Sequence, residues 1–362
     1  MNLEFTPEQH AVRDSVRRCL HAAYDALSPE KKIDGAAVAL RGLADLGLAG
    51  LLVPAEFGGA EGGMTDAGAV CVELGRALDR GPWLVSAVAA VRILVRLGES
   101  GHRDALLTGI ADGSVVASVD VRAARAPAVV ATRSADSATL HGVAEVADLP
   151  MATVLLVPVI DGDRIGICAV DTGAPGISHE QAPSADRSRP LFRVRLDGAR
   201  SRWLGELPDT VVDAVVDEVL LAAMADALGS AERLLEITVA HAGVRHQFGR
   251  PIGAFQAVQH LCVDMLETVE LATGGVLYGL GAADTGDDES RHLAAIRAKA
   301  FSGRLVGVGD TAIQIFGGIG YTWEHEAHFH LERLLHWHGF LGGPDRYLRE
   351  IGAHLVRSVR NP

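Results

Sequence analysis

The spacing of hydrophobic residues divides the chain into two helical regions separated by a region of short strands. From about residue 6 to 112, apolar residues recur every three or four positions, which is typical of amphipathic helices. The segment Thr6-Pro7-Glu8-Gln9 predicts the start of the first helix, because threonine caps helices and proline is tolerated at the first helical position. Further helices are predicted near 36–46, 66–78 and 84–97.

Between about Gly113 and Leu207 the hydrophobic pattern changes to short runs rich in β-branched residues. Such runs, bounded by turn residues, are typical of strands. They occupy the segments 115–119, 154–159, 164–170 and 192–196. We therefore expect a small β domain between two helical regions.

From about Pro208 the pattern is helical again, with long segments near 209–242, 253–282 and 286–315, and we expect a turn over 281–288. The middle segment has a stripe with the spacing of a core-facing helix. The stripe consists of Phe255, Val258, Leu261, Cys262, Met265, Leu266 and Val269. The sequence thus predicts a mainly α protein with a middle β domain, divided into residues 1–112, 113–207 and 208–362.

Charge and composition exclude several classes of function. The chain has 362 residues, and its 33 basic against 46 acidic side chains give a net charge of −13. An anionic surface argues against general binding of nucleic acid or lipid headgroups. No run approaches 18 uninterrupted apolar residues, so no membrane span is expected.

The four cysteines and the N-terminus bear on the compartment. Cys19, Cys71, Cys168 and Cys262 are far apart and form no CxxC pair, so neither a disulfide framework nor a thiolate zinc site is expected. Residues 1–5 lack the basic and apolar stretches of a signal peptide. We therefore expect a cytoplasmic protein.

Two sequence motifs, at 245–260 and 314–324, have residues suited to binding a nucleotide. Arg245 supplies a permanent, forked cation that fits a pyrophosphate. Gln256 offers both a donor and an acceptor for an adenine edge or a ribose. The pair Gly317-Gly318 has no side chains, so its backbone N–H groups could approach a phosphate or ring closely, although glycine here could also simply end a helix.

Both motifs, in this order and at this separation, resemble the acyl-CoA dehydrogenase flavoprotein family. That family typically shows R-x-x-F-G-x-x-I-x-x-x-Q followed by Q-x-x-G-G-x-G-Y. The segments 5–9, 53–59 and 73–78 are also similar to the family's N-terminal helix, Gly-Gly loop and next helix. The resemblance covers most of the chain. It implies an N-terminal helical domain, a small middle β domain and a C-terminal four-helix bundle, usually assembled as a dimer of dimers.

The resemblance also implies a cofactor and a reaction. In the family, FAD lies at a subunit interface, and its ADP half is reached by the residues that match Arg245, Phe248, Gln256, Gln314, Gly317 and Gly318. On spacing alone, Phe248 and Phe255 are instead expected to pack in the core. The usual reaction is α,β-desaturation of an acyl-CoA thioester, in which a glutamate removes the α-proton and flavin N5 takes the β-hydride. The implied electron acceptor is an electron-transfer flavoprotein.

The sequence departs from the family where the flavin ring and the catalytic base would be. The T-E-x-x-x-G-S-D-type and W-I-T/S-N-type segments are missing from 119–127 and 140–146. The usual position of the glutamate falls at or near Leu341-Gly342-Gly343, and an alternative helix position falls on Val219. Glu218 is adjacent to Val219 but rotated by about 100° on a helix. It is therefore a candidate base only through this adjacency, and the alternative is a solvated glutamate.

The retained and missing parts together favour a half-site. Certain bacterial members are α2β2 heterotetramers, several of them acting on bulky thioesters such as steroid side-chain CoAs, in which a degenerate subunit completes the ADP half of its partner's FAD site. This chain resembles such a degenerate subunit. Two alternatives stay open: a self-sufficient homomeric enzyme, such as a homotetramer, that uses Glu218 or another base, and a flavin-free CoA-thioester-binding or scaffold protein.

A metal site is a further alternative, suggested by histidines crowded near the C-terminus. HxxH and HxH spacings occur among His325, His328, His330, His336 and His338. No cysteine or recognisable metal-site motif accompanies them, and His325 and His328 fall where family members carry a T-W-E-H-x-x-H-type sequence without a metal. We therefore expect no metal.

Overall fold

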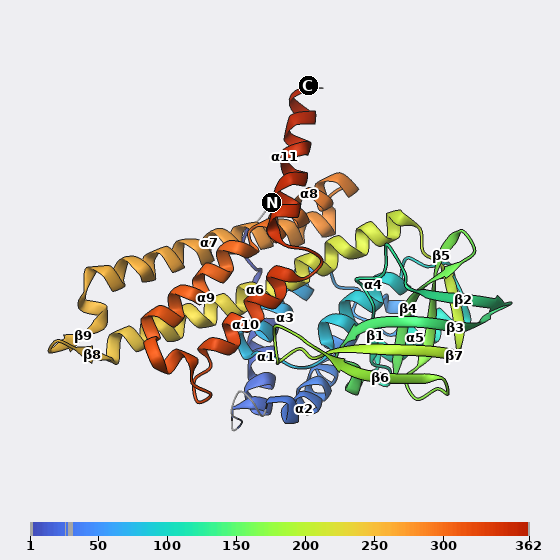
Figure 1. The fold of residues 1–362 in the computed structure, drawn as a ribbon, viewed down its shortest axis with the longest axis horizontal. Coiled ribbons are helices and arrows are strands. Elements are labelled where there is room, and N and C mark those ends of the chain that lie inside the picture. The colour runs from blue at the N-terminus through green and yellow to red at the C-terminus, as the bar shows by residue number, and fades with distance from the viewer. Residues whose placement is uncertain (1–2, 26, 28–31, 361–362) are drawn as a thin grey trace.

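The computed structural model describes residues 3–25, 27 and 32–360 and has helices on both sides of a sheet domain along the chain (Figure 1). The first helical part contains α1 (Pro7–Tyr24), α2 (Lys32–Asp45), the short turns η2 (Leu48–Gly50) and η3 (Ala55–Phe57), α3 (Met64–Ala77), η4 (Leu84–Ala90), α4 (Val91–Leu94) and α5 (Gly101–Ala111). The predicted start of α1 is confirmed, because Thr6 accepts a hydrogen bond from the backbone N–H of Gln9 and the Gln9 side chain accepts one from Thr6. The predicted 84–97 helix is instead a π-helical turn, η4, followed by the short α4.

The strands form a closed, twisted sheet at one side of the molecule (Figure 1). They are β1 (Ala117–Val119), β2 (Val129–Ser134), β3 (Ser137–Ala147), β4 (Val154–Asp161), β5 (Arg164–Asp171), β6 (Ile177–Ala182) and β7 (Leu191–Glu206). The hydrogen-bonded order is β1-β4-β2-β3-β7-β5, and β4 also pairs with β5, which closes the path. The missing family segments therefore leave the sheet itself intact.

The second helical part is a bundle built around one long central helix. It contains α6 (Asp209–Val244), β8 (His246–Gln247), β9 (Arg250–Pro251), η6 (Ile252–Ala254), α7 (Gln256–Thr285), α8 (Asp288–Ala300), α9 (Ser302–Phe316), η7 (Gly317–Tyr321), α10 (Ala327–Gly339) and α11 (Pro344–Arg360). Glycine allows α6 to approach α3 closely, since a Cβ on Gly75 would lie 1.9 Å from the Asp226 carbonyl oxygen and one on Gly229 would lie 1.8 Å from that of Val72. Within the described residues, no helix has both the length and the apolar character needed to cross a membrane.

Three expectations for this part are corrected by the structure. The predicted 286–315 helix is two helices, α8 and α9, separated at Phe301. The helix before it continues through Gly281 to Thr285, so the predicted turn begins too early. Of the predicted core stripe on α7, Met265 and Val269 are buried, whereas Leu266 is 47% exposed because it lies on the outer side of the helix.

A fully buried arginine, Arg333 on α10, connects all three parts of the chain. It donates to Asp186 of the segment before β7 at 2.5 Å and to Asp226 of α6 at 3.0 Å. It also donates to the backbone carbonyl of Asp79, after α3, and to the Ser188 hydroxyl, each at 2.7 Å. We call these five residues the Arg333 cluster.

Candidate functional site

Every residue predicted to contact the cofactor is exposed in this chain. They are Arg245, Phe248, Gln256, Gln314, Gly317 and Gly318. The first two belong to the segment that contains the β8–β9 hairpin, which lies at the end of the bundle farthest from the sheet (Figure 1). Polar groups exposed in this way are available to a ligand or to another subunit.

The β8–β9 hairpin lies within the first motif and has a tight turn that directs the Phe248 ring into solvent. Phe248 and Gly249 both have positive φ, 53° and 79°, as a two-residue hairpin turn requires. The Phe248 side chain is 92% exposed and touches Phe255 only edge to face, at 6.2 Å between ring centroids. The expectation that Phe248 packs in the core is therefore wrong, because the turn directs its ring outward.

The two glycines of the second motif differ in what they require. Gly317 ends α9 with φ 64° and ψ −142°, a conformation that is open to glycine and strained for other residues. A Cβ on Gly318 would meet no atom within 4 Å, so nothing in the described part of the chain needs a glycine there. The open space at Gly318 fits the close approach of a phosphate or ring, which is what an ADP moiety would need.

A cluster of three tilted aromatic rings connects the end of α6, just before the first motif, to the second motif. The ring of Phe316, directly before Gly317, lies between the imidazoles of His241 and His325, with centroids 4.7 and 4.2 Å away. His241 is one turn before Arg245, whose backbone N–H donates to the His241 carbonyl at 2.9 Å. Burial lowers the pKa of both imidazoles, so they are uncharged at neutral pH and Arg245 is the fixed cation here.

Neither family position for the catalytic base carries a carboxylate, and each position lines a cavity. Val219 lines a cavity of about 40 Å³ together with Trp337 and Phe340. Leu341 lines a second cavity of about 240 Å³.

Glu218 lies in a buried ion cluster and lines neither cavity. Its side chain is 0% exposed, so the expectation of a solvated glutamate is wrong. One carboxylate oxygen accepts from Arg92 at 2.5 Å and from Arg96 at 2.7 Å, and the other accepts from Arg92 at 2.8 Å. Both oxygens are thus occupied by guanidinium groups from α4 and the turn after it, which leaves this carboxylate poorly placed to take a proton from a substrate.

Three other carboxylates line these cavities and were not identified from the sequence. Glu145 of β3 lies at the small cavity and pairs with Arg193 at 3.4 Å. Asp217 and Glu350 lie at the larger cavity, and both bond to His292 at 2.9 Å. No local pattern distinguishes these residues, because the packing of separate elements brings them to the cavities.

The histidines near the C-terminus form packing and capping contacts. His325 accepts a hydrogen bond from the backbone N–H of Ala327 at 3.1 Å, and His330 bonds to the Ser230 hydroxyl at 2.8 Å. Across the described ranges, no group of three or more His, Cys, Asp or Glu is placed to hold a metal ion.

Comparison with known proteins finds the same family over both helical parts of the chain. Residues 6–114 match the model of the acyl-CoA dehydrogenase N-terminal domain, and residues 219–356 match that of the C-terminal domain. Acyl-CoA dehydrogenase IpdE2 of Mycolicibacterium smegmatis is 31% identical, over 86% of this chain and 85% of that protein. Acyl-CoA dehydrogenase FadE34 of Mycobacterium tuberculosis is 35% identical over 98% of this chain, and the chain spans about half of FadE34, 49% of its length.

A solved structure has the same fold over nearly the whole chain. The steroid ACAD Tcur3481-Tcur3483 variant superposes with a TM-score of 0.85 at 26% identity, covering 98% of this chain and 99% of the other. The fold therefore extends through the middle β domain, where the sequence motifs are missing.

Proposed function

Because the chain belongs to the acyl-CoA dehydrogenase family, we propose that it is one subunit of an FAD-dependent enzyme that desaturates an acyl-CoA thioester at the α,β position. In this proposal the chain contributes the ADP half of an FAD site to a homologous partner subunit in an α2β2 assembly. One observation carries it: the motif residues for the ADP half are all present and exposed, while both base positions, Val219 and Leu341, are apolar.

The chain's own residues have defined tasks in this assignment. Arg245 would pair with the pyrophosphate, and the backbone N–H groups of Gly317 and Gly318 would approach it. Gln256 and Gln314 would bond to the adenine or ribose. When bound, FAD supplies the acceptor for a hydride. The proton acceptor would come from the partner subunit, because the chain's own base positions are apolar.

The relatives support a partner and a bulky substrate. FadE34 is about twice as long as the matched region, so about half of its length lies outside that region and has room for a second subunit-sized part. The name of the similar solved structure combines two proteins and describes a steroid enzyme. We therefore propose a steroid-type acyl-CoA as the substrate and an electron-transfer flavoprotein as the acceptor.

Purification with and without partners tests this function. The chain alone should bind little FAD, and co-expression with a full-length homologous dehydrogenase should give a yellow complex that reduces an electron acceptor with an acyl-CoA. A yellow, active homomer would overturn the half-site in favour of a self-sufficient enzyme. Colourless protein with every partner, yet binding CoA thioesters, would leave a flavin-free binding protein.

Replacing Arg245 tests the cofactor assignment directly. Arg245→Ala should weaken retention of FAD by the complex by about 1.5–3 kcal/mol, because it removes a charge-assisted contact. Arg304→Ala removes another exposed cation, from α9, and serves as the control. Equal FAD retention in both variants, measured by fluorescence titration, would contradict the assignment.

A further inference from the structure

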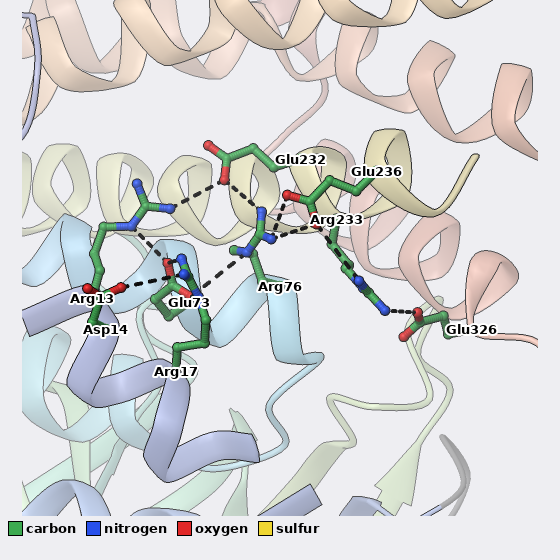
Figure 2. Close-up of polar contacts among 9 residues, drawn as sticks. All are labelled: Arg13, Asp14, Arg17, Glu73, Arg76, Glu232, Arg233, Glu236 and Glu326. Atoms are coloured by element: carbon green, nitrogen blue, oxygen red, sulfur yellow. Dashed lines mark hydrogen bonds and ion pairs between the residues drawn. The ribbon is translucent and has the colours of Figure 1, made fainter. Parts of the chain in front are cut away.

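The loop that follows α9 is attached to α6 at both of its ends. At one end, Phe316 packs on His241. At the other end, Arg233 donates to Glu326 at 2.7 Å, directly before α10 (Figure 2). Between these two contacts lies the segment 317–325, which contains Gly317 and Gly318.

The two attachment points, Arg233 and His241, lie about two turns apart on α6, which ends just before Arg245. Arg233, His241 and Arg245 are spaced by eight and four residues, so at 1.5 Å per residue they lie about 12 and 6 Å apart along the axis. Attaching both ends of the loop to α6 therefore holds the Gly-Gly backbone near the end of the helix that is followed by Arg245.

The Arg233–Glu326 contact is a charged pair at neutral pH. Burial opposes ionisation of Glu326, but hydrogen bonds and charges from His330 and Arg233 outweigh it and hold the pKa of this carboxyl well below its usual value. Both members of the pair are partly enclosed: 39% of the Arg233 side chain and 25% of the Glu326 side chain are exposed. Such a pair is weakened less by solvent than a fully exposed one.

Arg233 is in turn held by a chain of ion pairs that reaches the N-terminal helices (Figure 2). Its other carboxylate, Glu236, lies 3.8 Å away and also accepts from Arg76 of α3 at 2.7 Å. Arg76 and the α1 residues Arg13 and Arg17 surround Glu73, whose side chain is only 1% exposed. The pair thus connects the ion-pair network of α1, α3 and α6 on one side to the end of the loop on the other.

We propose that Arg233 and Glu326, together with the His241, Phe316 and His325 rings, are positioning residues that hold the Gly317-Gly318 backbone near Arg245 for the ADP half of the cofactor. This inference rests on the proposed function but makes a separate statement about the free chain. These contacts already order the loop in the chain without FAD.

Hydrogen exchange on the full chain without FAD tests the ordering. Glu326→Gln should speed amide exchange in a peptide covering 317–326 by about tenfold, because it removes the loop's charged attachment. Glu236→Gln is the matched control, since it removes the other carboxylate of Arg233 and leaves the loop contact in place. Equal exchange in the two variants overturns the proposal.

Flavin affinity of the co-expressed complex tests the consequence. Glu326→Gln and Arg233→Met should raise the Kd for FAD about tenfold, or about 1.4 kcal/mol. Arg233→Lys should retain near-normal affinity, because an ammonium can still pair with Glu326. Glu236→Gln should lower thermal stability without changing the Kd. Changes in stability with an unchanged Kd in all variants overturn the positioning role, whereas absence of FAD from the wild-type complex counts against the proposed function and leaves the exchange result standing.

Discussion

At the scale of single residues, we expect the two adjacent glycines after α9 to differ: Gly317 is needed for the fold and Gly318 for binding. Gly317→Ala should lower the free energy of unfolding of the chain by about 1–3 kcal/mol, because alanine is strained at φ 64° and ψ −142°. Gly318→Ala should leave the free energy of unfolding unchanged, since its Cβ meets no atom within 4 Å, and should weaken FAD binding in the complex. Urea unfolding of the chain and flavin titration of the complex measure the two effects. A large loss of stability from Gly318→Ala would contradict this division.

One substitution tests whether Glu218 stabilises the fold through its ion pairs or acts as the catalytic base. Glu218→Gln should cost about 3 kcal/mol of stability, because it leaves the guanidiniums of Arg92 and Arg96 without their buried anion. The rate of desaturation per folded complex should stay the same. Asp213→Asn, which removes an exposed partner of Arg125, is the control and should change stability by less than about 0.5 kcal/mol. Unchanged stability with lost desaturation would identify Glu218 as a base.

At the scale of elements, the hydrophobic pattern predicts those segments that carry a long run or a regular stripe of buried apolar residues. The long helices α6 and α7 and the apolar strands β4 and β5 are of this kind. The strand β6, with sequence ISHEQA, lacks the pattern because most of its side chains are exposed and only its pairing with β7 makes it a strand.

Other features depend on contacts between residues far apart in the sequence. The residue between α8 and α9, Phe301, is neither a glycine nor a proline, so no local signal marks the break. A long-range contact lies next to it: Lys299 donates to the carbonyls of Trp337 and His338 at the end of α10. Likewise, Glu218 meets arginines more than a hundred residues away, which no local motif encodes. The motifs named six candidate cofactor contacts from local sequence alone, and the structure places all six at the surface, while their contact with a cofactor stays a prediction.

The last helix, α11, has a pH-dependent connection to the rest of the bundle through His292. This imidazole bonds to Asp217 and to Glu350 of α11, and these bonds, chiefly the one with Asp217, raise its pKa to about 9. Because the folded pKa lies above the unfolded value, the stabilisation is complete below about pH 6.5 and is lost as the pH rises through about 9. With the side chain 34% exposed, screening limits the effect to about 1 kcal/mol.

Thermal unfolding between pH 6 and pH 9.5 measures this contribution as the difference between the wild type and His292→Gln. The difference should be largest at the acidic end and should shrink toward pH 9.5. His21→Gln, at a largely exposed position on α1, is the control and should give a small, constant difference. A difference that grows with pH would contradict the assignment.

At the scale of the whole molecule, several arginines of this strongly acidic chain lie where its parts meet. Arg92 of α4 and Arg96 of the turn after it pair with Glu218 of α6, and Arg76 joins α3 to α6. Arg333 joins both helical parts to the sheet domain. Since Arg245 lies exposed at the far end of the same bundle, rigid packing of these junctions would set its position relative to a partner subunit.

The Arg333 cluster predicts that the three parts unfold together. Arg333→Met should cost about 3–5 kcal/mol, because it leaves Asp186 and Asp226 buried without their cation. It should also separate unfolding of the sheet domain from that of the bundle, since the cluster is a direct polar connection between them. Calorimetry should then show two transitions in the variant and one in the wild type, with Arg304→Met, which changes an exposed arginine, behaving as wild type. A single transition with a loss below about 1 kcal/mol would mean that apolar contacts alone hold the parts together, and the position of the cofactor end would then not depend on this arginine.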